Sequence, residues 1–140
     1  MALEHVHVIW GWWDGPLEGI ADFHGTPHVF ECQFSEENDE WTDLYRLMEI
    51  EPALLKLAQE MSAIFQRWRT EWERGNTSIE THPALPADRS RYDELQEATA
   101  QGLKVRRSAS ILRRARFICE AVMDCRRVEW AEPDRPIHDP

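Results

Sequence analysis

The sequence predicts an α+β fold in which an N-terminal three-stranded antiparallel meander packs on a long helix. Three observations carry this prediction. Runs of β-type residues separated by turns fill residues 5–34, apolar residues recur at helical spacing over 52–74, and a second helical pattern follows at 88–102. A chain of 140 residues that is 42% hydrophobic is long enough to form a single domain with its own core.

Two short segments with turn composition, residues 14–16 and 24–27, set the expected register of the meander. Pairing across both turns places the large apolar side chains on one face of the sheet, opposite small residues, with Trp12 opposite Gly19 and Ala21 opposite Phe30. That packed face is predicted to hold Val8, Trp10, Trp12, Ala21, Phe23, Phe30, Cys32 and Phe34. Trp13 is predicted to point away from it.

The long helix is the clearest single element of the chain. Pro52 suits its first position and Gly75 suits its end. Its apolar stripe is expected to lie on the packed sheet face. A second helix is expected over 88–102, while residues 103–125 fit both helical spacing and strand alternation and are left open. A short strand at 128–130 and a loose tail over 133–140 complete the prediction.

Charge is distributed unevenly along the chain. The net charge is −10, yet residues 104–127 hold eight bases and only two acids. An acidic protein is repelled by phosphate backbones, so nucleic acid is a poor candidate partner. We expect the basic segment to lie near the acidic segment 31–51, either in the fold or in a dimer. A local anion or RNA patch is the alternative.

The cysteines and the N-terminal sequence are used to predict the cellular compartment of the protein. Cys32, Cys119 and Cys125 match no paired motif and are interpreted as reduced thiols. No signal peptide is recognisable, and no apolar run approaches the ~20 residues that a membrane helix needs. We therefore expect a cytoplasmic bacterial protein that does not associate with a membrane.

A histidine cluster is the sharpest chemical pattern. In the expected register His5, His7, Asp22 and His24 share one sheet face, and three imidazoles with a carboxylate suit a transition metal. The alternative is that they are polar residues on a solvated sheet face. No cofactor motif and no catalytic signature is present, so we predict no cofactor and lean against an enzyme.

The leading functional hypothesis is a non-catalytic protein-interaction or self-associating domain, with a homo-oligomer or another protein as partner. Surplus aromatic residues and two oppositely charged segments motivate it. The contacts are assigned to Trp13, Trp72, Arg106, Arg107, Arg113, Arg114 and Arg116. The alternative is a small metal-dependent or small-molecule-acting enzyme that uses the histidine cluster.

Residues 13–19 and 25–30, with the sequences Trp-Asp-Gly-Pro-Leu-Glu-Gly and Gly-Thr-Pro-His-Val-Phe, carry a resemblance. They resemble small uncharacterised bacterial proteins that are grouped only as domains of unknown function. The resemblance covers about the first fifty residues. It implies a bacterial hairpin-plus-helix domain and assigns no catalytic or ligand residue.

Overall fold

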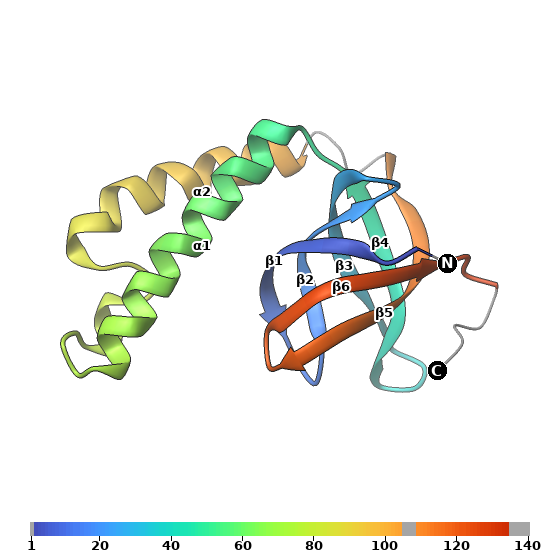
Figure 1. Ribbon diagram of the computed structural model, residues 1–140, viewed down its shortest axis with the longest axis horizontal. Helices are drawn as coiled ribbons and strands as arrows, with labels where there is room; N and C mark the ends of the chain where they lie inside the picture. Colours follow the sequence, from blue (N-terminus) through green and yellow to red (C-terminus); the bar gives the residue numbers. More distant parts are fainter. Residues whose placement is uncertain (1, 105–108, 135–140) are drawn as a thin grey trace. The chain divides into compact units, whose positions relative to one another are not determined.

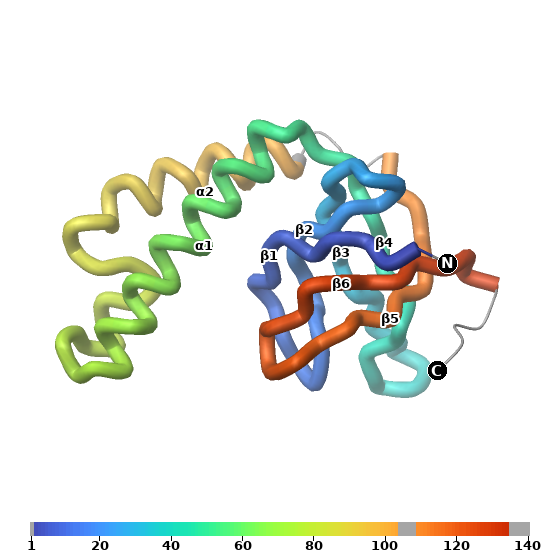
Figure 2. The backbone as a smooth tube through the Cα atoms, in the orientation of Figure 1, coloured from blue at the N-terminus to red at the C-terminus, as the bar shows by residue number. Residues whose placement is uncertain are grey.

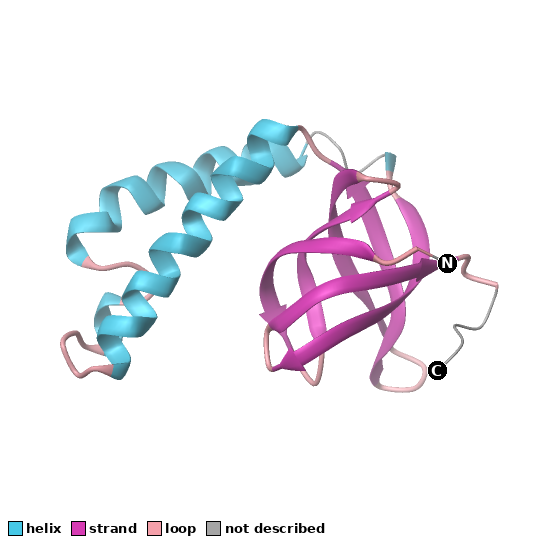
Figure 3. Cartoon of the chain, in the orientation of Figure 1, coloured by secondary structure: helices cyan, strands magenta, loops and turns pink. Residues whose placement is uncertain are grey.

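Six antiparallel strands form a closed barrel in the computed structural model, which describes residues 2–104 and 109–134 (Figure 1). Each strand pairs with the next along the chain, and the last pairs with the first. The strands are β1 (Glu4–Trp12), β2 (Pro16–Phe23), β3 (Thr26–Ser35), β4 (Glu40–Glu49), β5 (Ile111–Ala121) and β6 (Asp124–Ala131). Two long helices lie in the chain between β4 and β5 (Figure 3).

The predicted fold class is therefore wrong. The first three strands exist, but they are half of a closed barrel rather than a three-stranded sheet packed on a helix. Glu40–Glu49 form β4, and within the segment left open between helix and strand, Ile111–Ala121 form β5 and residues 124–125 begin β6. The apolar sheet face that was expected to meet the long helix is instead the barrel interior, because a curved sheet that closes on itself buries its own inner face.

Four aromatic rings fill the barrel interior. Phe30, Tyr45, Phe117 and Trp130 come from four different strands, and each pair of ring centroids lies between 5.1 and 6.3 Å apart. All of these pairs are T-shaped or tilted, the geometry that aromatic quadrupoles favour. Smaller residues complete the core, namely Val6, Ala21, Leu47, Ala115 and Val128.

The predicted strand register also needs correction. Gly19, not Ala21, lies opposite Phe30, and Ile9, not Trp12, lies opposite Gly19. Three register shifts interrupt the pairing of β1 with β2. Each irregularity changes which side chains face inward. The inward and outward positions counted from the turn are therefore wrong farther along β1. This is why Trp10, predicted in the core, is exposed.

The chain divides into two compact units. The barrel unit comprises residues 1–51 and 106–140, and the helical unit comprises residues 52–105. The tube in Figure 2 follows the chain from β4 into the helical unit and back into β5. The expectation of a single domain stays a prediction.

Within the helical unit, α1 (Pro52–Glu73) and α2 (Arg89–Lys104) form an antiparallel hairpin. These bounds agree with the helices predicted over 52–74 and 88–102. Two short 3₁₀ turns, η1 (Ile79–Thr81) and η2 (Pro86–Asp88), connect them. Ile64, Ala84 and Leu95 form the core of the hairpin. No helix among residues 2–104 and 109–134 is long and apolar enough to cross a membrane.

Strand direction brings three hairpin turns to one end of the barrel. In an antiparallel series the turns after β1, β3 and β5 lie at the same end, and Figure 1 shows all three at the lower end of the barrel. We call this the turn end and define it by residues 10–18, 34–41 and 118–125. The β2–β3 turn, the last residues of β4 and the first residues of β5 belong to the opposite end.

Candidate functional site

The histidine cluster lies at the place where β1 and β6 close the barrel. His7 Nε2 lies 2.8 Å from Asp22 Oδ1, and the rings of His5 and His7 are 4.5 Å apart. The Arg127 guanidinium lies 2.7 Å from His5 Nδ1. The structure thus brings together His5, His7 and Asp22, as the sequence predicted.

His24 does not join this group through any interaction of the described residues. It lies in the β2–β3 turn, where its ring packs on Phe23 with centroids 4.2 Å apart. Its backbone N–H, and that of Gly25, donate to the carboxylate of Glu4. Both His24 and Gly25 have positive φ, which suits a tight hairpin turn, so the residue is explained by its position in that turn.

The electrostatics of the cluster oppose cation binding. Partial burial, the neighbouring His7 and the Arg127 guanidinium lower the pKa of His5, in that order of size. A guanidinium beside His5 Nδ1 also occupies the lone pair that a metal ligand would need. Among the described residues no three His, Cys, Asp or Glu side chains are arranged to hold a metal ion. Metal binding here stays a prediction that the geometry does not favour.

The arginines predicted as contact residues have acidic neighbours in their own barrel. Arg114 forms an ion pair with Asp43 at 2.8 Å. Arg113 lies 3.6 Å from an oxygen of Glu132, and its guanidinium lies over the Phe23 ring. β5 pairs with β4, so the basic segment lies beside the acidic one, as expected. Arg106 and Arg107 lie outside the described residues.

Arg116 belongs to the same strand, but its guanidinium makes fewer hydrogen bonds than it could. Its Nε lies 3.6 Å from Glu129, the residue directly opposite on β6. That Nε is buried and has no hydrogen-bond partner in the described part of the chain. A buried donor without a hydrogen-bond partner is unusual in proteins, and Arg116 differs in this from Arg113 and Arg114.

The cysteines differ from their expected state. Cys119 and Cys125 face each other across the β5–β6 hairpin and form a disulfide, so their interpretation as reduced thiols is wrong. Cys32 is a free thiol, partly buried, and donates to the Thr42 carbonyl oxygen at 3.0 Å. Burial raises the pKa of Cys32 above its ordinary value. A thiol held neutral in this way is a weak nucleophile.

Large hydrophobic side chains are exposed at the turn end. Trp13 is 70% exposed in the β1–β2 turn, and Val122 is 71% exposed in the β5–β6 turn. Phe34 and Trp41 pack edge to face on either side of the β3–β4 turn. Six of the seven exposed large hydrophobic residues described in the barrel unit belong to the turn end, namely Trp10, Trp13, Phe34, Trp41, Ile118 and Val122.

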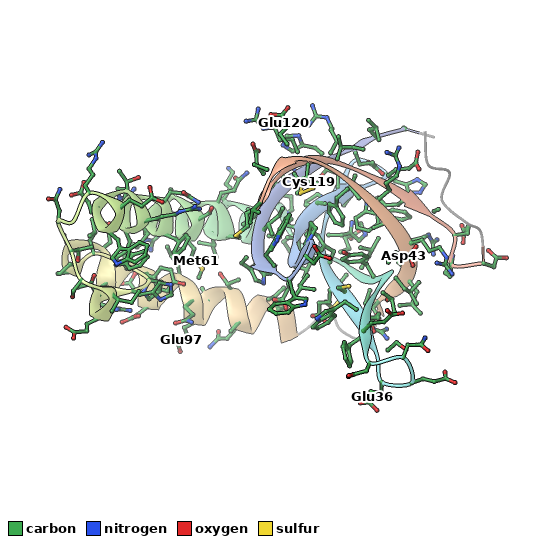
Figure 4. The ribbon with its side chains drawn as sticks, turned by 90° about the horizontal axis from the view of Figure 1, so that it is seen from below. Glu36, Asp43, Met61, Glu97, Cys119 and Glu120 are labelled. Carbon is green, nitrogen blue, oxygen red and sulfur yellow. A yellow bond between two sulfur atoms is a disulfide. The ribbon has the colours of Figure 1, made fainter. Side chains whose placement is uncertain are left out.

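The turn end is also strongly acidic. Its three segments contain eight Asp and Glu residues and neither Lys nor Arg. Figure 4 looks onto the turn end from below, with Glu36 at the β3–β4 turn and Glu120 on the β5–β6 hairpin, on different sides of the barrel. These acids, called the acidic rim below, thus occupy the same three segments as the exposed aromatic and aliphatic side chains.

The helical unit has an exposed aromatic residue and an open groove. Trp72 is 46% exposed and stacks on Trp68, with ring centroids 5.7 Å apart. A groove of about 880 Å³ lies between α1 and residues 76–87. Its lining mixes small apolar side chains with Arg67, whose guanidinium is already bound to Asp88 through two hydrogen bonds.

The sequence predicted only part of the turn end. It placed Trp13 outward, but it placed Trp10 and Phe34 in the core and assigned no contact role to Trp41, Ile118 or Val122. Strand alternation predicts which side a residue faces, whereas exposure at a strand tip depends on where the barrel ends. The density of acids at 36–40 was the available signal, since a solvated rim is where such a run is found.

Comparison with protein-family models, with curated proteins and with solved structures found no match for this chain. The resemblance of its first fifty residues to small bacterial proteins of unknown function stays an expectation.

Proposed function

We propose that this protein is a non-catalytic interaction protein and that its turn end binds a basic, partly apolar segment of a partner protein. One observation carries the proposal: the exposed aromatic and aliphatic residues of the barrel gather where the chain has eight acids and no base. Clustered apolar side chains with a charged rim are typical of protein-binding surfaces.

The side chains at the turn end suit this role. Trp13 presents most of its ring to solvent, and Trp contributes strongly to binding when a partner covers it. Trp41 and Phe34 add an aromatic pair at the β3–β4 turn. These rigid rings lose little conformational entropy on binding, so they bind a partner at low entropic cost.

The charge selects the chemistry of the partner. The acidic rim attracts Lys and Arg side chains and speeds their association. It repels phosphate backbones, which excludes nucleic acid as the occupant of this surface. Within the basic segment, Arg113 and Arg114 lie against acids of the same barrel, which makes them less available to phosphates.

The alternative is a small enzyme that acts through His7 and Asp22, and one observation favours it, the 2.8 Å contact between their side chains. A carboxylate that orients an imidazole is the arrangement of a general base. The free thiol, Cys32, packs against the interior barrel core instead of sitting with this pair. We therefore rank the interaction role first.

Selection from a random peptide library displayed on phage tests the proposal. We expect wild-type protein to enrich peptides that combine Lys or Arg with large apolar residues. Synthetic copies should bind the Trp13→Ala/Trp41→Ala variant about tenfold or more weakly, the size of a lost aromatic contact. Trp72→Ala, in the helical unit, is the matched control and should bind as the wild type does.

The proposal is wrong if no peptide is enriched, or if the enriched peptides have no excess of basic residues. It is also wrong if they bind the Trp13→Ala/Trp41→Ala variant as tightly as wild-type protein. Circular dichroism of each variant verifies that the barrel is folded.

A further inference from the structure

The pairing of β4 with β5 stops halfway along both strands. The described pairs run from Leu47 opposite Ile111 to Leu44 opposite Arg114. Beyond that point, the described pairs of β5 are all with β6, and those of β4, at Glu40 and Trp41, are with β3. Figure 1 shows β4 and β5 diverging toward the turn end.

One edge of β5 therefore has no partner over residues 115–121 among the strands that the structure describes. An unpaired strand edge presents a row of N–H and C=O groups that another strand can pair with. The last four residues, 118–121, are all exposed. The register with β6 shifts on both sides of Cys119, and such irregularities bend a strand away from its sheet.

The sequence of this edge is self-complementary. Residues 115–121 read Ala-Arg-Phe-Ile-Cys-Glu-Ala. If two copies pair antiparallel about Ile118, each Arg116 lies opposite Glu120 of the other copy, and Ile118 lies opposite itself. Opposite charges and apolar residues that face each other across an antiparallel pair are stabilising.

Only this kind of register keeps the two sheets continuous. Ala115 and Phe117 belong to the barrel interior, so Arg116 and Ile118 alternate with them on the outward face up to the register shift at Cys119. A shift by one residue would place inward residues opposite outward ones. A shift by two would place Arg116 opposite Ile118 and lose both charge pairs.

We propose that this protein forms a two-fold symmetric dimer by pairing the β5 edges of two copies, with Arg116 and Glu120 as reciprocal ion pairs around Ile118. The occupant of the edge is a second copy because the complementarity is between residues of one strand. Arg116, which already lies 3.6 Å from Glu129 of its own barrel, gains a second acidic neighbour in the dimer. Ile118 and Glu120 belong to the turn end, so the dimer would use this part of it and leave the β1–β2 and β3–β4 turns of each copy for the partner proposed above.

Native mass spectrometry and light scattering over a concentration series test the dimer. Wild-type protein should be dimeric. Ile118→Arg and Glu120→Arg each place arginines opposite one another at the two-fold, so each should raise the dimer Kd about tenfold or more. Val122→Arg adds the same charge in the turn beyond the paired residues and should leave the dimer intact.

A charge exchange tests the register. The double variant Arg116→Glu/Glu120→Arg should restore the dimer that Glu120→Arg weakens, because the two ion pairs reform with their signs reversed. If circular dichroism shows that this variant does not fold, Ile118→Arg and Glu120→Arg decide. A monomeric wild type, or a dimer that persists in both of these variants, would overturn the proposal, and a folded double variant that stays monomeric would overturn the register.

Discussion

Gly19 shows at the level of a single residue how tightly the barrel interior is filled. A Cβ atom at this position would overlap the Val8 carbonyl oxygen and would lie 2.7 Å from Cζ of the Phe30 ring. Both neighbours are held in place, the first by the backbone of β1 and the second by three aromatic rings. Neither can move without disturbing the core.

Gly19→Ala should therefore lower the free energy of unfolding by about 2 kcal/mol or more, because overpacking forces side chains and backbone out of place. Chemical denaturation of the two proteins measures the difference. Gly11→Ala is the matched control, since its Cβ would lie 3.4 Å from its nearest neighbours, an ordinary contact. An equal loss in both variants would contradict this account of the core.

The β5–β6 hairpin shows what one element adds to the barrel. β5 and β6 are joined by backbone pairing and by the disulfide between Cys119 and Cys125, six residues apart in sequence. Disulfides are typical of oxidising compartments. The cytoplasmic location expected from the sequence therefore stays a prediction, and this hairpin does not support it.

Reduction of the disulfide should lower the free energy of unfolding by about 2 kcal/mol, the chain-entropy value for so short a loop. The measurement is denaturation with and without a thiol reductant. The Cys119→Ser/Cys125→Ser variant should be insensitive to the reductant, while Cys32 remains available in both proteins. If reductant changes the variant as much as the wild type, the stabilisation does not come from this bond.

At the scale of the whole barrel, closure depends on the shortest of its six strand pairings, the seam between β1 and β6. β1 and β6 pair only through Glu4 opposite Val128 and His5 opposite Arg127 among the described residues. The Arg127 guanidinium lies against His5 Nδ1 at this seam. A proton on His5 would remove that acceptor and place two cations side by side, so the seam favours neutral His5.

The barrel should therefore lose stability as the pH falls below about 6.5, the ordinary histidine pKa. The pKa of His5 is lower in the folded state than in the unfolded chain. As the pH falls, the unfolded chain therefore binds the proton first, which lowers its free energy relative to the folded state. Above that pH, His5 is neutral in both states and makes no contribution. The thermal midpoint of wild type and His5→Asn, compared above and below this pH, measures the effect.

His5→Asn removes the titrating ring, so its midpoint should fall less than that of the wild type over the same acid step. His82→Asn serves as the matched control, because His82 packs on Phe65 and Trp68 in the helical unit, away from the β1–β6 pairing. If the two variants respond alike, the pH dependence originates elsewhere in the protein.

The sequence by itself determined the local elements of this protein. Pro52, Gly75 and a helical apolar stripe predicted α1 because a helix is stabilised along its own segment, and turn composition located the first two hairpins. The same local rules left residues 103–125 open, since Ala115, Phe117 and Cys119 fit a strand while other apolar residues fit a helix. Local pattern cannot choose between them when neither periodicity dominates.

Only the tertiary structure decided that the sheet closes. Closure requires β1 to pair with β6 and β4 to pair with β5, although more than sixty residues of sequence separate the strands of each pair. No local pattern encodes such pairing. It also decided that Trp10 and Phe34 are exposed while Phe117 is core, because exposure depends on bulges and on where the barrel ends. The aromatic and acidic residues of the turn end are far apart in sequence, and strand direction alone brings them together.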